Sequence, residues 1–349
     1  MTSVAGYARK KENQLYRAKT VTLVVEYECK AREQVLNLMG NWLTKENFMT
    51  EKHRDRTAQV SGEGLNCEES RNCQENGDRI LLAVSFGTSF EDTREKTIGA
   101  IERRMAERFP DWKVMRCFTS RMIRKKLLER DGLHIDSPEE AICRARESGC
   151  REMVLQPLYL MHGLEHRRLM DLLAEPEYKT AGIRVGKPLL SDRSDFSVLA
   201  QAVRRHLPVS ERDTAVVLMG HGNGKKRAGT SPDTDASNRN VMDNAVFSLL
   251  QEALCESGDD RYYVATVEGE PALEDVLPKM AEKHYKKIIL SPFMVVAGDH
   301  ARNDLAGDGE DSWKSIFLRK GFQVQTIVQG IGEWEEVQEL FAEHAKMSM

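Results

Sequence analysis

The feature that most constrains the fold of this 349-residue chain is an internal repeat. The segment LLAVSFGTS, which begins at Leu81, aligns with VVLMGHGNG, which begins at Val216. A second pair, PLYLMHGLEHRRLM from Pro157 and PFMVVAGDHARNDL from Pro292, shows the same separation of 135 residues. Because chance matches have no reason to share one offset, the chain is predicted to contain two copies of one structural unit.

From Arg79 onward, short apolar runs alternate with longer amphipathic segments, which is the pattern of βα units around a parallel sheet. We therefore predict an α/β protein of two similar Rossmann-like halves, whose parallel sheets are related by a pseudo-twofold axis. Ligands of open parallel sheets bind beyond the carboxyl ends of the strands, so the active-site cleft is expected between the halves. The predicted strands are residues 79–86, 112–118, 152–160, 183–189, 214–220, 261–268, 286–295 and 322–328.

The repeat also predicts the domains: residues 79–210 form the first half, and residues 211–349 form the second half. Residues 1–78 contain one apolar stretch and then a polar stretch rich in Glu, Asn and Gly. We interpret them as an N-terminal appendage and linker of unknown role, or alternatively as an artefact of the assigned start. Cys67 and Cys73, in this stretch, lack a second pair to complete a zinc site.

Composition excludes some classes of partner. The formal net charge is −4 and the isoelectric point is about 6.2, so no overall basic field favours nucleic acid or an anionic membrane. No apolar run approaches the roughly 18 residues that a membrane span needs, so we expect a cytoplasmic protein.

Positions at which the two copies differ indicate the chemistry. His221 stands opposite Phe86, and His300 stands opposite Glu165, so the second half alone has a histidine in both loops. Glu268 ends the strand that the sequence places between those loops. Two imidazoles and one carboxylate suit a borderline divalent cation. We therefore predict that His221, Glu268 and His300 form one metal site with catalytic function.

Two other polar clusters have less specific patterns. His162 and His166 lie four residues apart and are interpreted as surface histidines, with a second metal or proton-relay site in the first half as the alternative. Five basic residues are expected on one helix, where they form a solvated face or, if they reach the cleft, bind an acidic substrate. These are Arg121, Arg124, Lys125, Lys126 and Arg130.

The segments AVSFGTSFEDT, FTSRMIRKKL, MGHG, VEGEP and VAGDHARNDLAGDGEDSWK together resemble the anaerobic sirohydrochlorin cobaltochelatases of cobalamin biosynthesis. The resemblance runs from about residue 79 to the C-terminus. It implies a lyase-type enzyme that inserts divalent cobalt into sirohydrochlorin, a tetrapyrrole, without ATP or an organic cofactor. Cobalt and sirohydrochlorin are then the expected partners.

The resemblance also assigns roles to individual residues. It makes His221 a metal ligand and the proton acceptor, and Glu268 and His300 the other two ligands. Because VEGEP departs from the family's usual sequence, Glu270 competes with Glu268 for the carboxylate role. A substrate-facing loop is hypothesised from position alone, comprising Ser85, Phe86, Gly87, Thr88 and Ser89.

Two alternatives remain open at this point. An iron or nickel chelatase for siroheme or heme would use the same ligands, because metal affinity at such sites follows a general order rather than the identity of the substrate metal. A carrier that binds a tetrapyrrole or a metal without turnover would also use the same cleft.

Overall fold

The structure is a computed structural model that describes residues 79–179, 182–222 and 234–349, without the side chains of residues 234–244. The predicted appendage, with Cys67 and Cys73, lies outside the described residues. All the other candidate residues named above fall within them.

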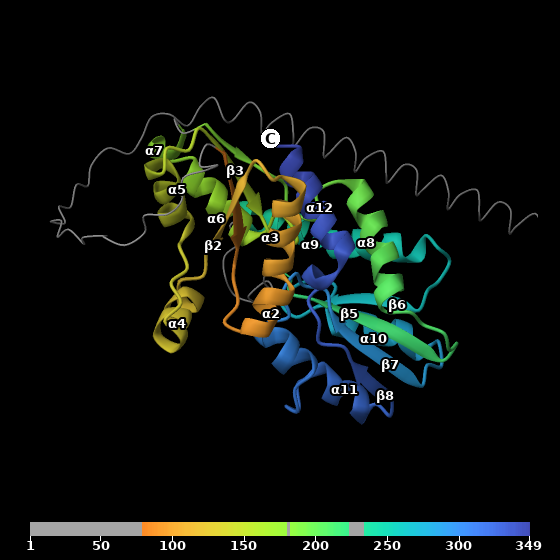
Figure 1. Cartoon of the computed structure of the whole chain (residues 1–349). Coiled ribbons are helices and arrows are strands. Elements are labelled where there is room, and N and C mark those ends of the chain that lie inside the picture. Colours follow the sequence, from red (N-terminus) through yellow and green to blue (C-terminus); the bar gives the residue numbers. More distant parts are fainter. Residues whose placement is uncertain (1–78, 180–181, 223–233) are drawn as a thin grey trace, which may run out of the picture. The chain divides into compact units, whose positions relative to one another are not determined.

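The first sheet contains four parallel strands in the order β2-β1-β3-β4 (Figure 1). Its strands are β1 (Arg79–Ser85), β2 (Lys113–Phe118), β3 (Glu152–Pro157) and β4 (Ile183–Val185). The helices that follow these strands are α2 (Glu91–Lys96), α3 (Ile98–Arg108), α4 (Arg121–Asp131), α5 (Pro138–Glu147), α6 (Leu164–Leu173), α7 (Pro176–Lys179) and α8 (Arg193–His206).

The second sheet is also parallel, and its order β6-β5-β7-β8 repeats that of the first. Its strands are β5 (Thr214–Gly220), β6 (Tyr262–Thr266), β7 (Lys287–Pro292) and β8 (Gln323–Thr326). Its helical elements are α9 (Thr234–Cys255), α10 (Leu273–Ala281), the π-helical turn η1 (Ala301–Leu305), α11 (Trp313–Arg319), the 3-10 turn η2 (Ile331–Glu333) and α12 (Glu335–Lys346). The prediction of two similar α/β halves with parallel sheets is confirmed.

Backbone hydrogen bonds show that the sequence offset is also a structural equivalence. Just after β3, the amide of Leu158 donates to the carbonyl of Val84 at 2.7 Å. Just after β7, the amide of Phe293 donates to the carbonyl of Met219 at 2.8 Å. Each residue stands 135 positions from its counterpart, so the repeat is preserved where the strands end. The pseudo-twofold axis and the cleft stay predictions.

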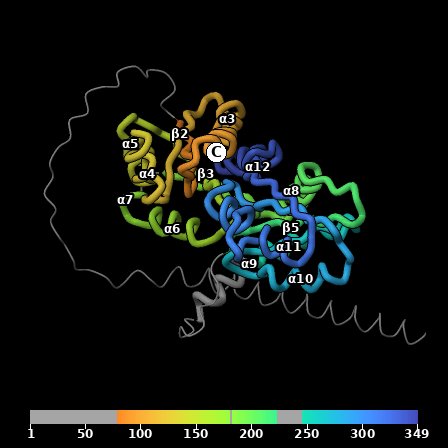
Figure 2. Tube along the Cα trace, turned by 90° about the horizontal axis from the view of Figure 1, so that it is seen from below, coloured from red at the N-terminus to blue at the C-terminus, as the bar shows by residue number. Residues whose placement is uncertain are grey.

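The two sheets share one hydrophobic core. Leu81 and Val154 of the first sheet belong to the same buried cluster as Val216 of the second and Phe341 of α12. Helix α12, at the end of the chain, packs on α3 and β3 of the first half, and α8 packs on α9 of the second (Figures 1 and 2). The last helix of each half therefore covers the other half.

A buried ion pair joins α8 to α12. Nε2 of His344 lies 3.5 Å from Oδ1 of Asp195, and both side chains are buried. Burial alone would lower the pKa of His344, but the Asp195 carboxylate outweighs burial, so this pKa lies above its ordinary value. Burial raises the pKa of Asp195, but His344 and the backbone amides of Ser191 and Asp192 bring it below its usual range.

This pair predicts a pH-dependent stability. Folded His344 holds its proton more tightly than an unfolded histidine, so its contribution is complete below roughly pH 6.5 and is lost as the pH rises through the folded pKa. His344→Gln is expected to lower the free energy of unfolding at about pH 6 by about 3 kcal/mol, because it leaves Asp195 buried without its partner. Urea unfolding at several pH values measures both effects.

The wild-type chain should lose stability as the pH rises above about 6.5, and the variant should lose less over the same rise. His284→Asn, at an exposed histidine whose positive φ of 56° an asparagine tolerates, is the matched control and should leave the pH dependence unchanged. Equal pH dependence in the wild type and the His344→Gln variant would show that the pair does not titrate in this way.

Candidate metal site

His221 and Glu268 are held together by the ends of β5 and β6. The amide of Glu268 donates to the carbonyl of His221 at 2.8 Å, directly beyond the paired strands. Gly222, with φ +81°, permits this approach because a Cβ there would lie 2.7 Å from the backbone carbon of Glu268. The sequence MGHG therefore places the imidazole where a larger neighbour would separate the two loops.

His300 comes from the loop after β7 and stands directly before η1. Its Nδ1 lies 2.5 Å from Oδ2 of Asp304, one turn later. A carboxylate partner of this kind fixes the orientation of a histidine that ligates metal. Single π-helical turns are often found at functional sites, and η1 contains Asp304.

The structure brings the three predicted ligands together. One ligand atom from each of His221, Glu268 and His300 lies within 4.8 Å of the other two. The two imidazole rings are nearly perpendicular, at 84°, with centroids 4.6 Å apart. His221 and Glu268 are exposed and His300 is partly buried, so a hydrated ion can reach the group from solvent.

Hydrogen bonds define which nitrogen of each imidazole can bind a cation. Nδ1 of His221 lies 2.9 Å from the carbonyl oxygen of Gly222, which can only accept, so this nitrogen carries the proton. The Asp304 carboxylate has the same effect on Nδ1 of His300. Both Nε2 atoms then offer lone pairs, which is the form that ligates a metal.

The first half carries different side chains on the same backbone. The amide of Ser120 donates to the carbonyl of Phe86 at 3.3 Å, as Glu268 does to His221. Ser120 and Phe86 therefore occupy the positions of two of the ligands. Glu165, opposite His300 in the repeat, accepts hydrogen bonds from Thr119 at 3.0 Å and Arg168 at 2.7 Å. Its carboxylate is already engaged by protein donors.

The hypothesised substrate loop exposes one side chain strongly. Phe86 is 48% exposed, whereas Ser85, Thr88 and Ser89 are at most 5% exposed. The hydroxyl of Thr88 accepts from the amide of Phe90 at 3.2 Å. This loop therefore presents an aromatic ring outward and keeps its hydroxyl groups inside.

The basic helix predicted around residues 121–130 is α4, and four of its five cations have protein partners, among them Lys125 with Glu129 at 3.6 Å and Lys126 over the ring of Phe90 at 5.9 Å. Arg124 pairs with Glu140 at 3.1 Å. Arg130 donates to Asp131 and to the carbonyl of Ser89, both at 2.6 Å. These two guanidinium groups are occupied in holding α4 to its neighbours.

Arg302 extends from η1 to the first half, a contact that the sequence analysis did not find. Its guanidinium carbon lies 4.2 Å from the centroid of the Phe90 ring, and its Nη2 donates to Oγ1 of Thr93 at 3.1 Å. It also lies 3.7 Å from Asp92. In the repeat, Arg302 aligns with an identical residue, Arg167, so it resembled shared scaffold rather than a functional side chain.

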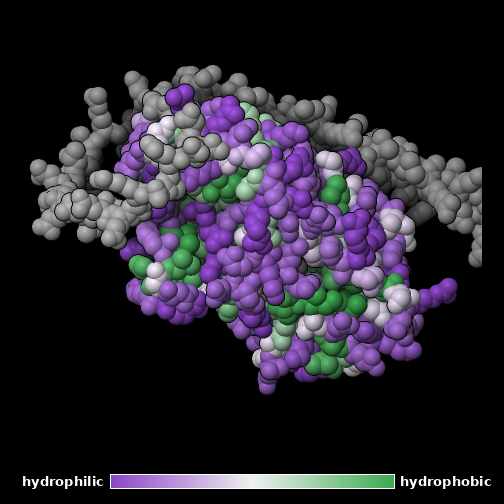
Figure 3. All heavy atoms as spheres, viewed as in Figure 1, coloured by the Kyte–Doolittle hydropathy of each residue, from purple (hydrophilic) through white to green (hydrophobic). Residues whose placement is uncertain are grey.

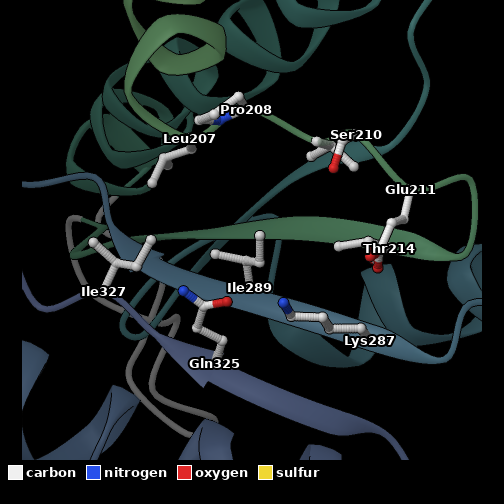
Figure 4. Close-up of a pocket in the computed structure, with 10 residues that line it drawn as sticks. Leu207, Pro208, Ser210, Glu211, Thr214, Lys287, Ile289, Gln325 and Ile327 are labelled. Carbon is white, nitrogen blue, oxygen red and sulfur yellow. The ribbon is translucent and has the colours of Figure 1, made fainter.

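A separate cavity of about 240 Å³ lies against β5, β7 and β8 (Figure 4). Hydrophobic surface gathers in this part of the second half in the view of Figure 3. Leu207, Ile289 and Ile327 contribute apolar side chains to the cavity, and Glu211 and Lys287 are its charged residues. None of the predicted metal ligands lines it.

The comparison with protein families decides the family. The cobalt chelatase (CbiK) family matches residues 79–349. The chain belongs to this family. This confirms the family indicated by the motifs.

Two curated relatives support the same assignment. The sirohydrochlorin cobaltochelatase of Salmonella typhimurium is 33% identical over 273 residues, which cover 78% of this chain and 96% of that protein. Sirohydrochlorin cobaltochelatase CbiKC of Nitratidesulfovibrio vulgaris is 28% identical, with 76% and 88% covered. The solved structure of SirB from Bacillus subtilis with Fe3+ has a TM-score of 0.49 and 16% identity, and covers 78% of this chain and 95% of that one.

In the part of the chain that the structure describes, no helix combines the length and apolarity that a membrane crossing requires. The expected cytoplasmic location and the absence of a nucleic-acid partner stay predictions.

The contact between His300 and Asp304 generates a test of the site. Asp304→Ala is expected to weaken Co2+ binding about 10-fold to 100-fold, the usual cost of removing the partner of a metal-bound histidine. Asp299→Ala is the matched control, because it removes the same charge one residue before His300. Calorimetric titration of each variant with Co2+ gives the dissociation constants, and equal losses in both would exclude an orienting role for Asp304.

Proposed function

We propose that the chain inserts divalent cobalt into sirohydrochlorin, without ATP or an organic cofactor. The observation that supports this most is the convergence of His221, Glu268 and His300 within 4.8 Å beyond three neighbouring strands. Two imidazoles and one carboxylate are a ligand set that suits a divalent metal of the borderline class. The similarity of the chain to sirohydrochlorin cobaltochelatases supports the choice of substrate.

In the proposed reaction, the cation first exchanges some of its waters for protein ligands. Two neutral imidazoles and one carboxylate hold it while other coordination positions stay open to water or to ring nitrogens. The carboxylate of Glu268 reduces the net charge of the bound ion from two to one. Because the three ligands come from separate loops, each can release the cation without disturbing the others.

Insertion then removes two N–H protons from the macrocycle for each divalent ion. As the cation moves to the ring nitrogens, the Nε2 lone pairs of His221 and His300 are released and can accept protons. Imidazole in general titrates near neutrality, which suits proton transfer at physiological pH. We assign the first acceptor role to His221, and the second histidine matches the second proton.

We assign the first half to the side of the predicted cleft that faces the proposed metal ligands. Phe86, which is 48% exposed, is assigned to face the macrocycle through its ring, together with the backbone of the loop at Ser85, Gly87, Thr88 and Ser89. Sirohydrochlorin is a polycarboxylate, so exposed basic groups at the rim can anchor it. Arg121, at the start of α4, is an exposed residue suited to this role.

The central experiment follows absorbance during anaerobic incubation of sirohydrochlorin and Co2+ with the enzyme. His221→Ala and His300→Ala are each expected to lower kcat/KM by at least about 100-fold, because each removes a ligand and a proton acceptor. His134→Ala, at an exposed histidine outside the site, is the matched control. Full rates in both site variants, with folding intact by circular dichroism, would refute the assignment.

The same assay distinguishes the alternatives. Cobalt is expected to give a higher kcat/KM than iron or nickel under matched conditions. A preference for iron would favour a ferrochelatase instead. Conversion of no more than one equivalent of tetrapyrrole per chain would show a carrier rather than an enzyme.

Arg302 yields a separate expectation about substrate position. Arg302→Met should lower kcat/KM for sirohydrochlorin while leaving the dissociation constant for Co2+ unchanged. The contact of Arg302 with Phe90 holds the substrate-facing loop of the first half in position relative to η1, but it does not involve the proposed metal ligands. A cation–π contact of this kind contributes roughly 0.5–2 kcal/mol, which corresponds to an effect of about 2-fold to 30-fold. Phe90→Leu should have an equal or smaller effect, because it keeps the contacts of Arg302 with Thr93 and Asp92, and the double variant should lose little more than Arg302→Met alone. Additive losses would show that the two side chains act independently.

A further inference from the structure

The cavity against the second sheet lies at the opposite end of the strands from the proposed metal ligands. Thr214 and Lys287 line it, and they are the first residues of β5 and β7. Gln325 of β8 also lines it, together with residues 207–211, which join α8 to β5 (Figure 4). The proposed metal ligands instead come after the ends of β5, β6 and β7. The cavity is therefore a separate place in the fold.

Two of these lining residues have counterparts at the constant offset of the repeat. Thr214 stands 135 positions after Arg79, and Lys287 stands 135 positions after Glu152. Arg79 and Glu152 begin β1 and β3, as Thr214 and Lys287 begin β5 and β7. The two pairs therefore occupy equivalent places on the two sheets.

Strand pairing gives the counterpart of Gln325. Gln325 of β8 lies opposite Ile289 of β7, and Arg184 of β4 lies opposite Val154 of β3. Ile289 stands 135 positions after Val154, so Gln325 takes the place of Arg184.

In the first half, this place is occupied by charged side chains that neutralise one another. Nε of Arg79 donates to Oε1 of Glu152 at 3.0 Å, and Nη2 of Arg184 donates to Oε2 of Glu152 at 2.8 Å. Nη1 of Arg184 also donates to the backbone oxygen of Met349, which follows α12 and packs against the shared core. The central anion therefore has two cationic partners, and a segment of the chain covers the apolar surface beside it.

In the second half, the central charge is reversed and the partners are neutral. Lys287 stands where the first half has Glu152. Thr214 and Gln325 stand where the first half has its two arginines. Among the residues that the structure describes, no acidic side chain forms an ion pair with Lys287. This place therefore has a cation without the counter-charge that its counterpart has.

A carboxylate of the chain also lines the cavity, but it is not paired with Lys287. Glu211 accepts a hydrogen bond from the hydroxyl of Thr214 at 3.3 Å. The amino group of Lys287 is directed away from Glu211 and toward Gln325 (Figure 4). Lys287 therefore presents its ammonium group to the interior of the cavity.

The remaining lining is largely apolar. Leu207 and Ile289 are buried, and Ile327 packs against the same shared core. The cavity measures about 240 Å³. Because an apolar cavity of about 150 Å³ accepts benzene, this cavity has room for a body of that size with one further polar group.

We propose that this cavity binds a small apolar monocarboxylate, such as benzoate or 4-methylpentanoate. The carboxylate pairs with Lys287 and accepts a hydrogen bond from the amide of Gln325, and such charge-assisted bonds are the stronger ones. The apolar body lies against Leu207, Ile289 and Ile327. This site is independent of the proposed chelatase reaction, because none of the proposed metal ligands lines the cavity.

The test is a calorimetric titration of the full chain with sodium benzoate and with sodium 4-methylpentanoate. The wild-type chain should bind one molecule of acid per chain. Lys287→Gln should weaken binding at least about 10-fold, because a hydrogen bond to a charged group is lost. Lys286→Gln is the matched control and should bind as the wild type does. It removes the same charge one residue earlier, from a side chain that is 77% exposed and pairs with Asp213 at 3.0 Å.

Changes of ligand separate the two parts of the site. Benzamide keeps the shape of benzoate without its charge, and acetate keeps the charge without the apolar body. Each should bind at least about 10-fold more weakly than benzoate. Gln325→Glu should abolish binding, because a carboxylate of the protein then pairs with Lys287, as Glu152 pairs with Arg184 in the first half.

Chemical shifts of the isoleucine methyl groups locate the ligand without any measurement of activity. The acid should shift the signals of Ile289 and Ile327, whereas the signal of Ile101, buried in the first half, should not move. The proposal is overturned if neither acid binds the folded wild-type chain, if Lys287→Gln binds as the wild type does, or if the shifts fall on other isoleucines. None of these outcomes bears on the metal ligands, which the cobalt assay tests separately.

Discussion

The parallel pairing of β5 with β6 on one side and β7 on the other is the constraint on which the proposed metal site depends. Parallel strands deliver their carboxyl ends to one edge of a sheet, so the loops after these three strands begin side by side. Every residue of β5 is buried, which fixes the central strand between its neighbours. The ligands themselves can then remain exposed without losing their mutual geometry, because the buried strands determine where the loops begin.

Comparison of the two copies of the repeat distinguishes the backbone features that both halves share from the side chains that only one half carries. Both halves keep the same strand order and the same hydrogen bonds beyond the strands. Phe86, Ser120 and Glu165 occupy, in the first half, the positions of the three proposed ligands in the second. One backbone thus supports an aromatic and hydrogen-bonded surface in one copy and the proposed cation-binding group in the other. His162 and His166 are a difference of the opposite kind, because here the first half has the histidines and the second half has alanines, Ala297 and Ala301.

Helix α12 connects the halves mainly through burial. Val337, Phe341 and Ala345 of this helix are fully buried in the core that both sheets share. Ion pairs also run along its contact with α3, but exposed pairs of this type contribute little, typically 0–1 kcal/mol each. Hydrophobic contact therefore sets how the halves meet, and the charges favour one register of the helices. These pairs join Arg104 and Arg108 to Glu335, Glu339 and Glu343.

The sequence by itself determined the features that depend on local pattern. Sequence pattern located all eight predicted strands to within a few residues. The central strands β1, β3, β5 and β7 stand out as apolar runs because they are buried on both faces, whereas the edge strands β4 and β8 are partly exposed. The constant offset predicted two copies, and the differences between them indicated His221 and His300. Glu268 followed from its place at the end of a strand.

Tertiary structure decided the features that depend on contacts between distant or competing residues. Asp299, Asn303 and Asp304 all lie near His300 in sequence, but only the turn of η1 brings the Asp304 carboxylate to Nδ1. The contact between Arg302 and Phe90 joins residues of different halves, and the placement of α12 on the first half joins the end of the chain to its earlier helices. Local periodicity records which face of an element is buried, but not which distant element buries it, so these contacts required the folded chain.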